Sequence, residues 1–148
     1  MKIDELTKKP IAVIVENNIS DDMVFPDTTI AELITMVRAK LHDEVFLLVY
    51  VDSKENKQII SVITSSDLEK LIGLIVDSGE VKITSELNFG AEFPLKFSVE
   101  ISEPIQIVLD MFEKENTDVI VVKSNEGKYQ GKIKRNKLKE WFNIMANN

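Results

Sequence analysis

Apolar residues recur along the chain with two spacings, one typical of helices and the other of buried strands. In the segments 28–41 and 103–115 apolar residues recur with the i, i+3, i+4 and i+7 spacing that marks one face of an α-helix. Uninterrupted apolar runs follow at 45–51 and 119–123, and such runs are typical of strands that are buried on both faces. The pattern therefore predicts a helix followed by a strand at two places in the chain.

Further elements flank each predicted helix–strand pair in the same order. A turn leads to a second strand and a second helix, near 58–63 and 66–76 in the first half and near 129–133 and 136–146 in the second. Strand-like leaders precede the two halves: Ile11–Val15 with Met23–Phe25, and Lys82–Thr84 with Leu95–Ile101. Candidate N-caps for the first helix of each half are Thr28 or Thr29, and Ser102. The order β-α-β-β-α is therefore predicted twice.

The two halves match each other as a tandem repeat. Segment 30–48 matches the later chain at an offset of 74 residues, and segment 61–75 matches it at an offset of 70, with apolar positions falling on apolar positions. We therefore predict an α+β protein with a first repeat and N-terminal leader at 1–76, a connection at 77–94 and a second repeat at 95–148. Neither half is long enough to bury two helices and a small sheet, so the halves are expected to pack on each other.

Composition narrows the classes of function. The 148 residues carry a formal net charge of −7, which argues against general nucleic-acid binding and against an anionic membrane surface. The absence of cysteine excludes disulfides, thiolate metal sites and a cysteine nucleophile, and a single histidine, His42, leaves little for a metal site. The apolar runs are too short to cross a bilayer, and the first residues have no apolar signal core. We expect a cytoplasmic protein.

A similar stretch joins the last strand of each half to its last helix. It reads Ser61-Val62-Ile63-Thr64-Ser65-Ser66-Asp67 in the first half and Gly131-Lys132-Ile133-Lys134-Arg135-Asn136-Lys137 in the second. A duplicated β-α-β-β-α unit with this stretch resembles a pair of CBS (cystathionine β-synthase) domains, also called a Bateman module. The first copy has serine in place of the usual glycine, and the second has lysine in the threonine and aspartate places. The resemblance covers residues 11–146 and implies two α+β repeats packed as one pseudo-two-fold module.

The resemblance also implies a regulatory sensor that binds AMP, ATP or S-adenosylmethionine and modulates a partner protein. Asp67 would accept two hydrogen bonds from the ribose diol, and Thr64 would hold a ribose or phosphate oxygen. Backbone N–H groups beside Ser65 and Ser66, where the helix begins, would offer an anion site. The other implied contacts are apolar residues against the base (Val24, Phe25 and Phe46) and basic residues toward phosphates (Lys134, Arg135 and Lys137).

The same residues also allow an interpretation without a ligand. Ser66 and Glu69 have the spacing of a helix capping box, and Phe25 and Phe46 could simply belong to the core. Lys137 has no acceptor for a diol, and residues 127–148, with six basic side chains and one acidic, could form a solvated or docking face. The alternative function is therefore a ligand-free dimerisation or docking module. Under both interpretations the resemblance to CBS-domain pairs implies a homodimer. The sequence has no enzyme motif and no metal or cofactor motif.

Overall fold

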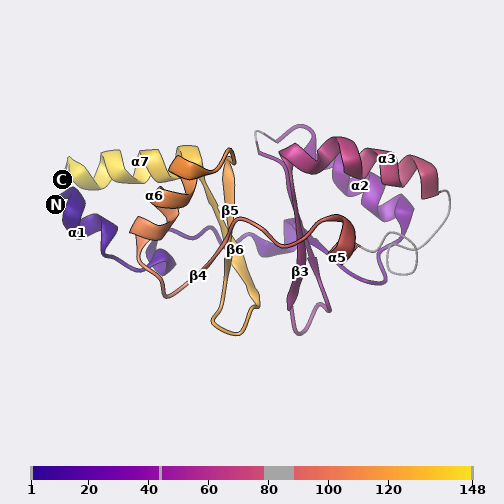
Figure 1. Cartoon of the computed structure of the whole chain (residues 1–148), viewed down its shortest axis with the longest axis horizontal. Coiled ribbons are helices and arrows are strands. Elements are labelled where there is room, and N and C mark those ends of the chain that lie inside the picture. Colours follow the sequence, from indigo (N-terminus) through magenta and orange to yellow (C-terminus); the bar gives the residue numbers. More distant parts are fainter. Residues whose placement is uncertain (1, 44, 79–88, 148) are drawn as a thin grey trace. The chain divides into compact units, whose positions relative to one another are not determined.

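The computed structural model describes residues 2–43, 45–78 and 89–147, and these separate into two compact units (Figure 1). The first-repeat unit consists of Ser20–Lys96. The second-repeat unit consists of two pieces of the chain, Met1–Ile19 and Phe97–Asn148. None of the helices in the described ranges has the length and apolar character that a bilayer span requires.

The first-repeat unit contains a three-stranded sheet of order β1-β2-β3. Its elements are β1 (Met23–Val24), α2 (Ile30–Lys40), β2 (Leu47–Val51), β3 (Ile59–Thr64), the 3₁₀ turn η3 (Ser65–Asp67), α3 (Leu68–Ser78) and the short helix α5 (Phe89–Glu92). Strands β1 and β2 are connected by helix α2 and pair in parallel, and β2 and β3 form an antiparallel hairpin. Apolar side chains of α2, the sheet, α3 and α5 form one buried core.

The second-repeat unit has the same topology, with a three-stranded sheet of order β4-β5-β6. Its elements are α1 (Ile3–Thr7), the 3₁₀ turn η1 (Ile11–Val13), β4 (Ser98–Glu100), α6 (Ile105–Lys114), β5 (Val119–Lys123), β6 (Tyr129–Lys134) and α7 (Arg135–Ala146), while η2 (Ile19–Asp21) crosses the boundary between the units. Strands β4 and β5 are parallel and β5 and β6 antiparallel, as in the first unit. The predicted α+β repeat is therefore present in both units.

The register of the repeat differs from the predicted one. Both hairpins carry a bulge, between Tyr50 and Val51 and between Val122 and Lys123, so the inner strands correspond at an offset of 72 residues. Buried positions of the first helices correspond at an offset of 75, Leu33 with Val108 for example. The predicted offset of 74 was wrong because the strands are continuously apolar and the helices carry several neighbouring apolar residues, so a slip of one or two residues still matches many apolar positions with apolar positions.

The N-terminal segment packs in the second-repeat unit, although the sequence placed it with the first repeat. Leu6 and Ile11 are fully buried there, and the Ile11 N–H donates to the Glu103 carbonyl at 2.9 Å. Residue Glu16 exchanges two backbone hydrogen bonds with Lys132, at 2.9 and 3.1 Å. The predicted strand Ile11–Val15 is instead the turn η1, because a short apolar run does not by itself distinguish a strand from a turn with one buried side.

The connection predicted at 77–94 is also different in its described part. Helix α5 places Phe89 and Phe93 in the core of the first-repeat unit, where each is at most 2% exposed. The chain leaves that unit between Lys96 and Phe97, and Phe97 has a left-handed φ of 54°. The predicted leader strand Lys82–Thr84 lies outside the described residues.

The helix starts follow local capping chemistry. Thr29, one of the two predicted candidates, is the N-cap of α2 and accepts a hydrogen bond from the Glu32 N–H at 3.1 Å. The prediction of Ser102 for the second repeat was wrong, because α6 begins after Pro104, whose φ of −73° suits the residue before a helix.

Candidate functional site

The predicted ribose-binding residues lie where β3 ends and α3 begins. The capping box predicted at Ser66 and Glu69 is formed instead by Thr64 and Asp67, because the turn η3 starts the helical backbone before α3 itself. Thr64 has extended backbone, with φ −111°, and its N–H donates to Asp67 Oδ2 at 3.0 Å. The capping box thus fixes the orientation of the Asp67 carboxylate.

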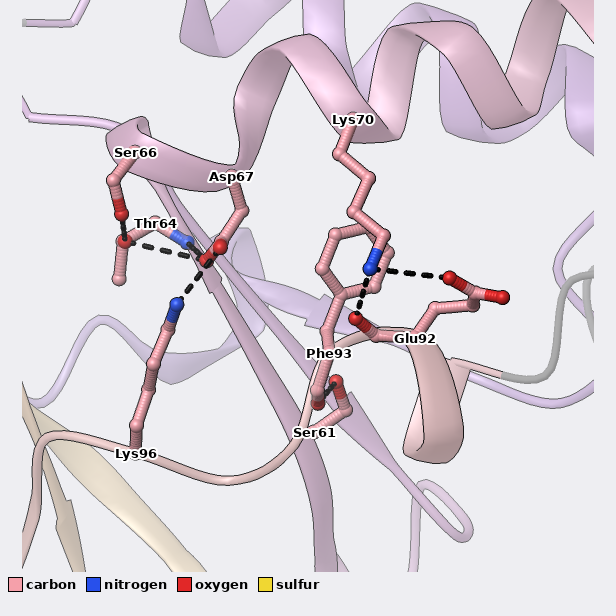
Figure 2. Close-up of polar contacts among 8 residues, drawn as sticks. All are labelled: Ser61, Thr64, Ser66, Asp67, Lys70, Glu92, Phe93 and Lys96. Carbon is pink, nitrogen blue, oxygen red and sulfur yellow. Dashed lines mark hydrogen bonds and ion pairs between the residues drawn. The ribbon is translucent and has the colours of Figure 1, made fainter.

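Both oxygens of the Asp67 carboxylate have partners (Figure 2). Oδ2 accepts the hydrogen bond from the Thr64 N–H and also lies 3.4 Å from the Thr64 hydroxyl. Oδ1 accepts a hydrogen bond from Lys96 Nζ at 2.8 Å, which also makes an ion pair. The Asp67 side chain is 14% exposed and that of Lys96 is 36% exposed, so the lysine covers the open side of a mostly buried carboxylate.

The two serines of the motif contribute hydroxyl groups to the same junction. The Ser66 hydroxyl lies 3.0 Å from the Thr64 hydroxyl, which places Thr64 Oγ1 between Ser66 and Asp67. The Ser65 hydroxyl accepts a hydrogen bond from the Phe46 N–H at 3.2 Å and ties the start of β2 to the junction. The hydroxyls of Thr64 and Ser66 and the carboxylate of Asp67 therefore share one network of hydrogen bonds, and the Ser65 hydroxyl lies at the same junction.

The segment Glu92–Lys96 runs beside this junction and was not predicted to contribute to it (Figure 2). The buried Ser61 hydroxyl donates to the Phe93 carbonyl at 2.5 Å, which gives the serine a partner at the place where the resemblance expects glycine. Lys70 Nζ contacts the Glu92 carbonyl at 2.8 Å and its carboxylate at 3.1 Å, and lies 5.4 Å from the centre of the Phe93 ring. These contacts hold the segment that carries Lys96.

The residues predicted to contact a base are placed less favourably. Val24 is fully buried and Phe46 is 4% exposed, and both belong to the core of the first-repeat unit. Phe25 is half-buried and lines a hollow of about 320 Å³, whose other lining residues are Pro26, Asp27, Asp52, Ser53, Lys54 and Glu55. That hollow is acidic, and a hydrogen bond from the Asn56 side chain lowers the pKa of the Asp52 carboxyl. The junction residues do not line it.

The three basic residues of the second copy are each engaged within the second-repeat unit. The Arg135 guanidinium donates to the carbonyls of Phe112 at 2.8 Å and Thr117 at 2.7 Å, so it closes the end of α6. Lys134 Nζ lies 4.0 Å from the Glu16 carboxylate. Lys137 is half-exposed and pairs with Glu140 at 3.5 Å. In this copy the Glu16 backbone also lies directly against Gly131, whose φ of +141° and lack of a side chain permit the approach.

Comparison with known proteins identifies the fold. No family model matches the sequence, and no curated protein matches it. Solved structures that resemble the chain include CBSX2 in complex with AMP, with a TM-score of 0.65 and 17% identity over 93% of this chain and 98% of that one. The CBS domain pair of protein MJ0100, in complex with 5′-methylthioadenosine and S-adenosyl-L-methionine, has a TM-score of 0.60 and 16% identity over 93% of this chain and 98% of that one.

A further match comes from a bacterial regulator. The CBS domains of a transcriptional regulator from Streptococcus pneumoniae have a TM-score of 0.62 and 14% identity over 89% of this chain and 98% of that one. These similarities extend over both units of the chain. The chain therefore has the fold of a CBS-domain pair, as its sequence predicted.

Proposed function

We propose that the chain is a regulatory module that binds an adenosine-containing nucleotide through Asp67 and Thr64, and that it has no catalytic activity of its own. The observation that carries the proposal is the Asp67 carboxylate, which the capping box with Thr64 fixes at the β3–α3 junction of a CBS-pair fold. The proposal is supported by two structures of the same fold that hold AMP, or 5′-methylthioadenosine and S-adenosylmethionine.

The chemistry of the junction suits a ribose. A carboxylate can accept hydrogen bonds from two neighbouring hydroxyl groups. Because the orientation of Asp67 is already fixed, less conformational entropy is lost when a ligand binds. The hydroxyls of Thr64 and Ser66 lie 3.0 Å apart beside that carboxylate and can exchange hydrogen bonds with a ribose or phosphate oxygen. Occupancy of the site would then shift the conformational equilibrium of the module and thereby the activity of a partner protein.

Calorimetric titration with AMP, ADP, ATP and S-adenosylmethionine tests the proposal. We expect at least one of these ligands to bind the parent protein, and Asp67→Asn to weaken that binding about tenfold or more, because the amide is uncharged and has an NH2 donor in place of one of the two acceptor oxygens. Glu69→Gln is the matched control, since Glu69 is an exposed acid two residues further along the chain. Equal affinity of the parent and Asp67→Asn, or no binding by any of the four ligands to folded protein, would contradict the proposal.

A ligand-free dimerisation or docking module is the second candidate. It is favoured by the ion pair of Asp67 with Lys96, which already neutralises the carboxylate, and by the lysine at 137 in the second copy. Exposed apolar side chains on α3 and α7, Ile72, Val76 and Ile144, support a homodimer in either case. Light scattering measures the oligomeric state, and a dimer that binds none of the four ligands would favour this second candidate.

We place the protein in the cytoplasm, with neither nucleic acid nor membrane among its partners.

A further inference from the structure

The Asp67 carboxylate has too few open acceptor positions for a ribose diol. A carboxylate offers roughly four lone-pair positions. Three are directed at the Thr64 N–H at 3.0 Å, the Thr64 hydroxyl at 3.4 Å and Lys96 Nζ at 2.8 Å. A diol that donates two hydrogen bonds to Asp67 must therefore displace one of these partners.

Lys96 is the partner on Oδ1, whereas both contacts from Thr64 fall on Oδ2, so a diol that bridges the two carboxylate oxygens competes with the lysine at Oδ1. The Thr64 N–H belongs to the backbone at the start of η3 and is held there by the capping box. The Lys96 side chain is 36% exposed, and its flexible stem can carry the ammonium group away into water or to another anion. Its backbone stays in place, because Phe93 and Glu92 of the same segment are bound to Ser61 and Lys70. Ribose binding would thus exchange the Lys96 ammonium for two neutral hydroxyls at the same carboxylate.

We propose that this exchange makes Lys96 a specificity-determining residue, which selects nucleosides that carry a phosphate on the 5′ carbon. The inference rests on the proposed function and deepens it. A 5′-phosphate is attached to the same sugar as the diol, so the displaced ammonium can move from the carboxylate to the phosphate and keep an anionic partner. Adenosine offers no such anion. S-adenosylmethionine carries a sulfonium cation at that position, which repels the ammonium group.

Calorimetric titration of AMP, adenosine and S-adenosylmethionine into the parent protein and Lys96→Met tests the inference. We expect the parent to bind AMP about tenfold more tightly than either of the other ligands, as the loss of one charged hydrogen bond would produce. In Lys96→Met the AMP affinity should fall and the adenosine affinity should rise, so that the preference is nearly lost. Damage to the fold alone would weaken all three ligands together and leave the preference intact.

Two further variants complete the experiment. Lys96→Arg keeps the positive charge and should keep the preference for AMP. Arg38→Met is the matched control, because Arg38 is an exposed basic side chain of the same unit and lies on α2, away from the Glu92–Lys96 segment in the sequence. It should leave the ratio of the AMP and adenosine affinities unchanged, and an equal loss of preference in this variant would overturn the role of Lys96.

The outcomes separate this inference from the proposed function. If AMP binds the parent and the preference survives Lys96→Met, the selection by Lys96 is refuted while nucleotide binding stands. If all three ligands bind Lys96→Met more tightly than the parent, Lys96 only blocks the carboxylate, and the selection for phosphate is again refuted. If neither protein binds AMP, adenosine or S-adenosylmethionine, the inference is wrong, and the proposed function is wrong as well if ADP and ATP also fail to bind the parent.

Discussion

Replacement of Arg135 by methionine should destabilise the second-repeat unit, because its guanidinium group closes the end of α6. The last carbonyls of a helix have no partner within the helix. Arg135 Nη2 donates to the carbonyls of Phe112 at 2.8 Å and Thr117 at 2.7 Å, with a longer contact of 3.4 Å to Glu115. The guanidinium carbon also lies 4.8 Å from the centre of the Phe112 ring. Methionine keeps much of the apolar stem but makes none of these polar contacts.

The contacts of Arg135 set the size of the expected effect. A hydrogen bond to a charged group contributes about 1.5–3 kcal/mol, and an exposed cation–π contact about 0.5–1 kcal/mol. The Arg135 side chain is 32% exposed, so water can replace part of what the guanidinium provides in the variant. We therefore expect Arg135→Met to lower the free energy of unfolding by about 2–3 kcal/mol, near the value of one good charged hydrogen bond with the ring contact.

Urea unfolding followed by tryptophan fluorescence measures this loss. Trp141 is the single tryptophan of the chain and lies on α7, in the same unit as Arg135. Lys137→Met is the control, because Lys137 lies on the same helix, is 56% exposed and makes one ion pair of 3.5 Å. It should cost less than about 0.5 kcal/mol. Arg135→Lys should recover only part of the loss, because lysine lacks the planar fork. Equal losses in Arg135→Met and Lys137→Met would refute the capping role.

Three further perturbations test other contacts. Asp22→Asn should lower the free energy of unfolding in urea by about 3 kcal/mol or more, because it removes the carboxylate that lies 2.8 Å from the Lys40 ammonium, and the Lys40 side chain is only 8% exposed. A loss no larger than that caused by removing an exposed ion pair would contradict this expectation. Burial raises the pKa of the Tyr50 hydroxyl, so the folded state binds the tyrosine proton more tightly than the unfolded state does. The free energy of unfolding, measured by circular dichroism, should therefore fall as the pH rises above about 10, and it should fall less in Tyr50→Phe. Gly131→Ala should destabilise the protein by about 2 kcal/mol or more, since Gly131 has a φ of +141° and the added Cβ would collide with a backbone carbonyl. Gly73→Ala is the contrasting variant: Gly73 has open space around it on α3, and the change should stabilise the protein by about 0.5–1 kcal/mol in the same assay.

The order of the elements was predictable because helix and strand spacing is a local property of the sequence. The helix predicted at 28–41 is found at Ile30–Lys40, and the strand predicted at 129–133 is found at Tyr129–Lys134. The place of the N-terminal segment was not predictable, because its burial depends on residues that follow about a hundred positions later, such as Glu103. The local sequence predicts that the apolar Ile11 will be buried, but it does not indicate in which of the two cores.

The candidate site was predictable to the same limited extent. The motif located Thr64 and Asp67, whose contact spans three residues and therefore depends on local backbone alone. Lys96 is 29 residues from Asp67, and a lone lysine after Pro94 and Leu95 carries no mark of the ion pair it makes. The engagement of Arg135 with the end of α6 was missed for the same reason, since the carbonyls that it contacts lie 18 and 23 residues away.

The divided second-repeat unit has a consequence for how the chain folds. The first-repeat unit is one continuous stretch, Ser20–Lys96, whose core can close while the chain is still being synthesised. Leu6 and Ile11 must wait for β4 and α6, and the long loop that separates them makes this closure slow. Helices α1 and α7 are in contact, and both termini lie at the same end of this unit (Figure 1). A circular permutant that joins those termini and opens the chain before Phe97 would make both cores contiguous and should refold faster than the natural order.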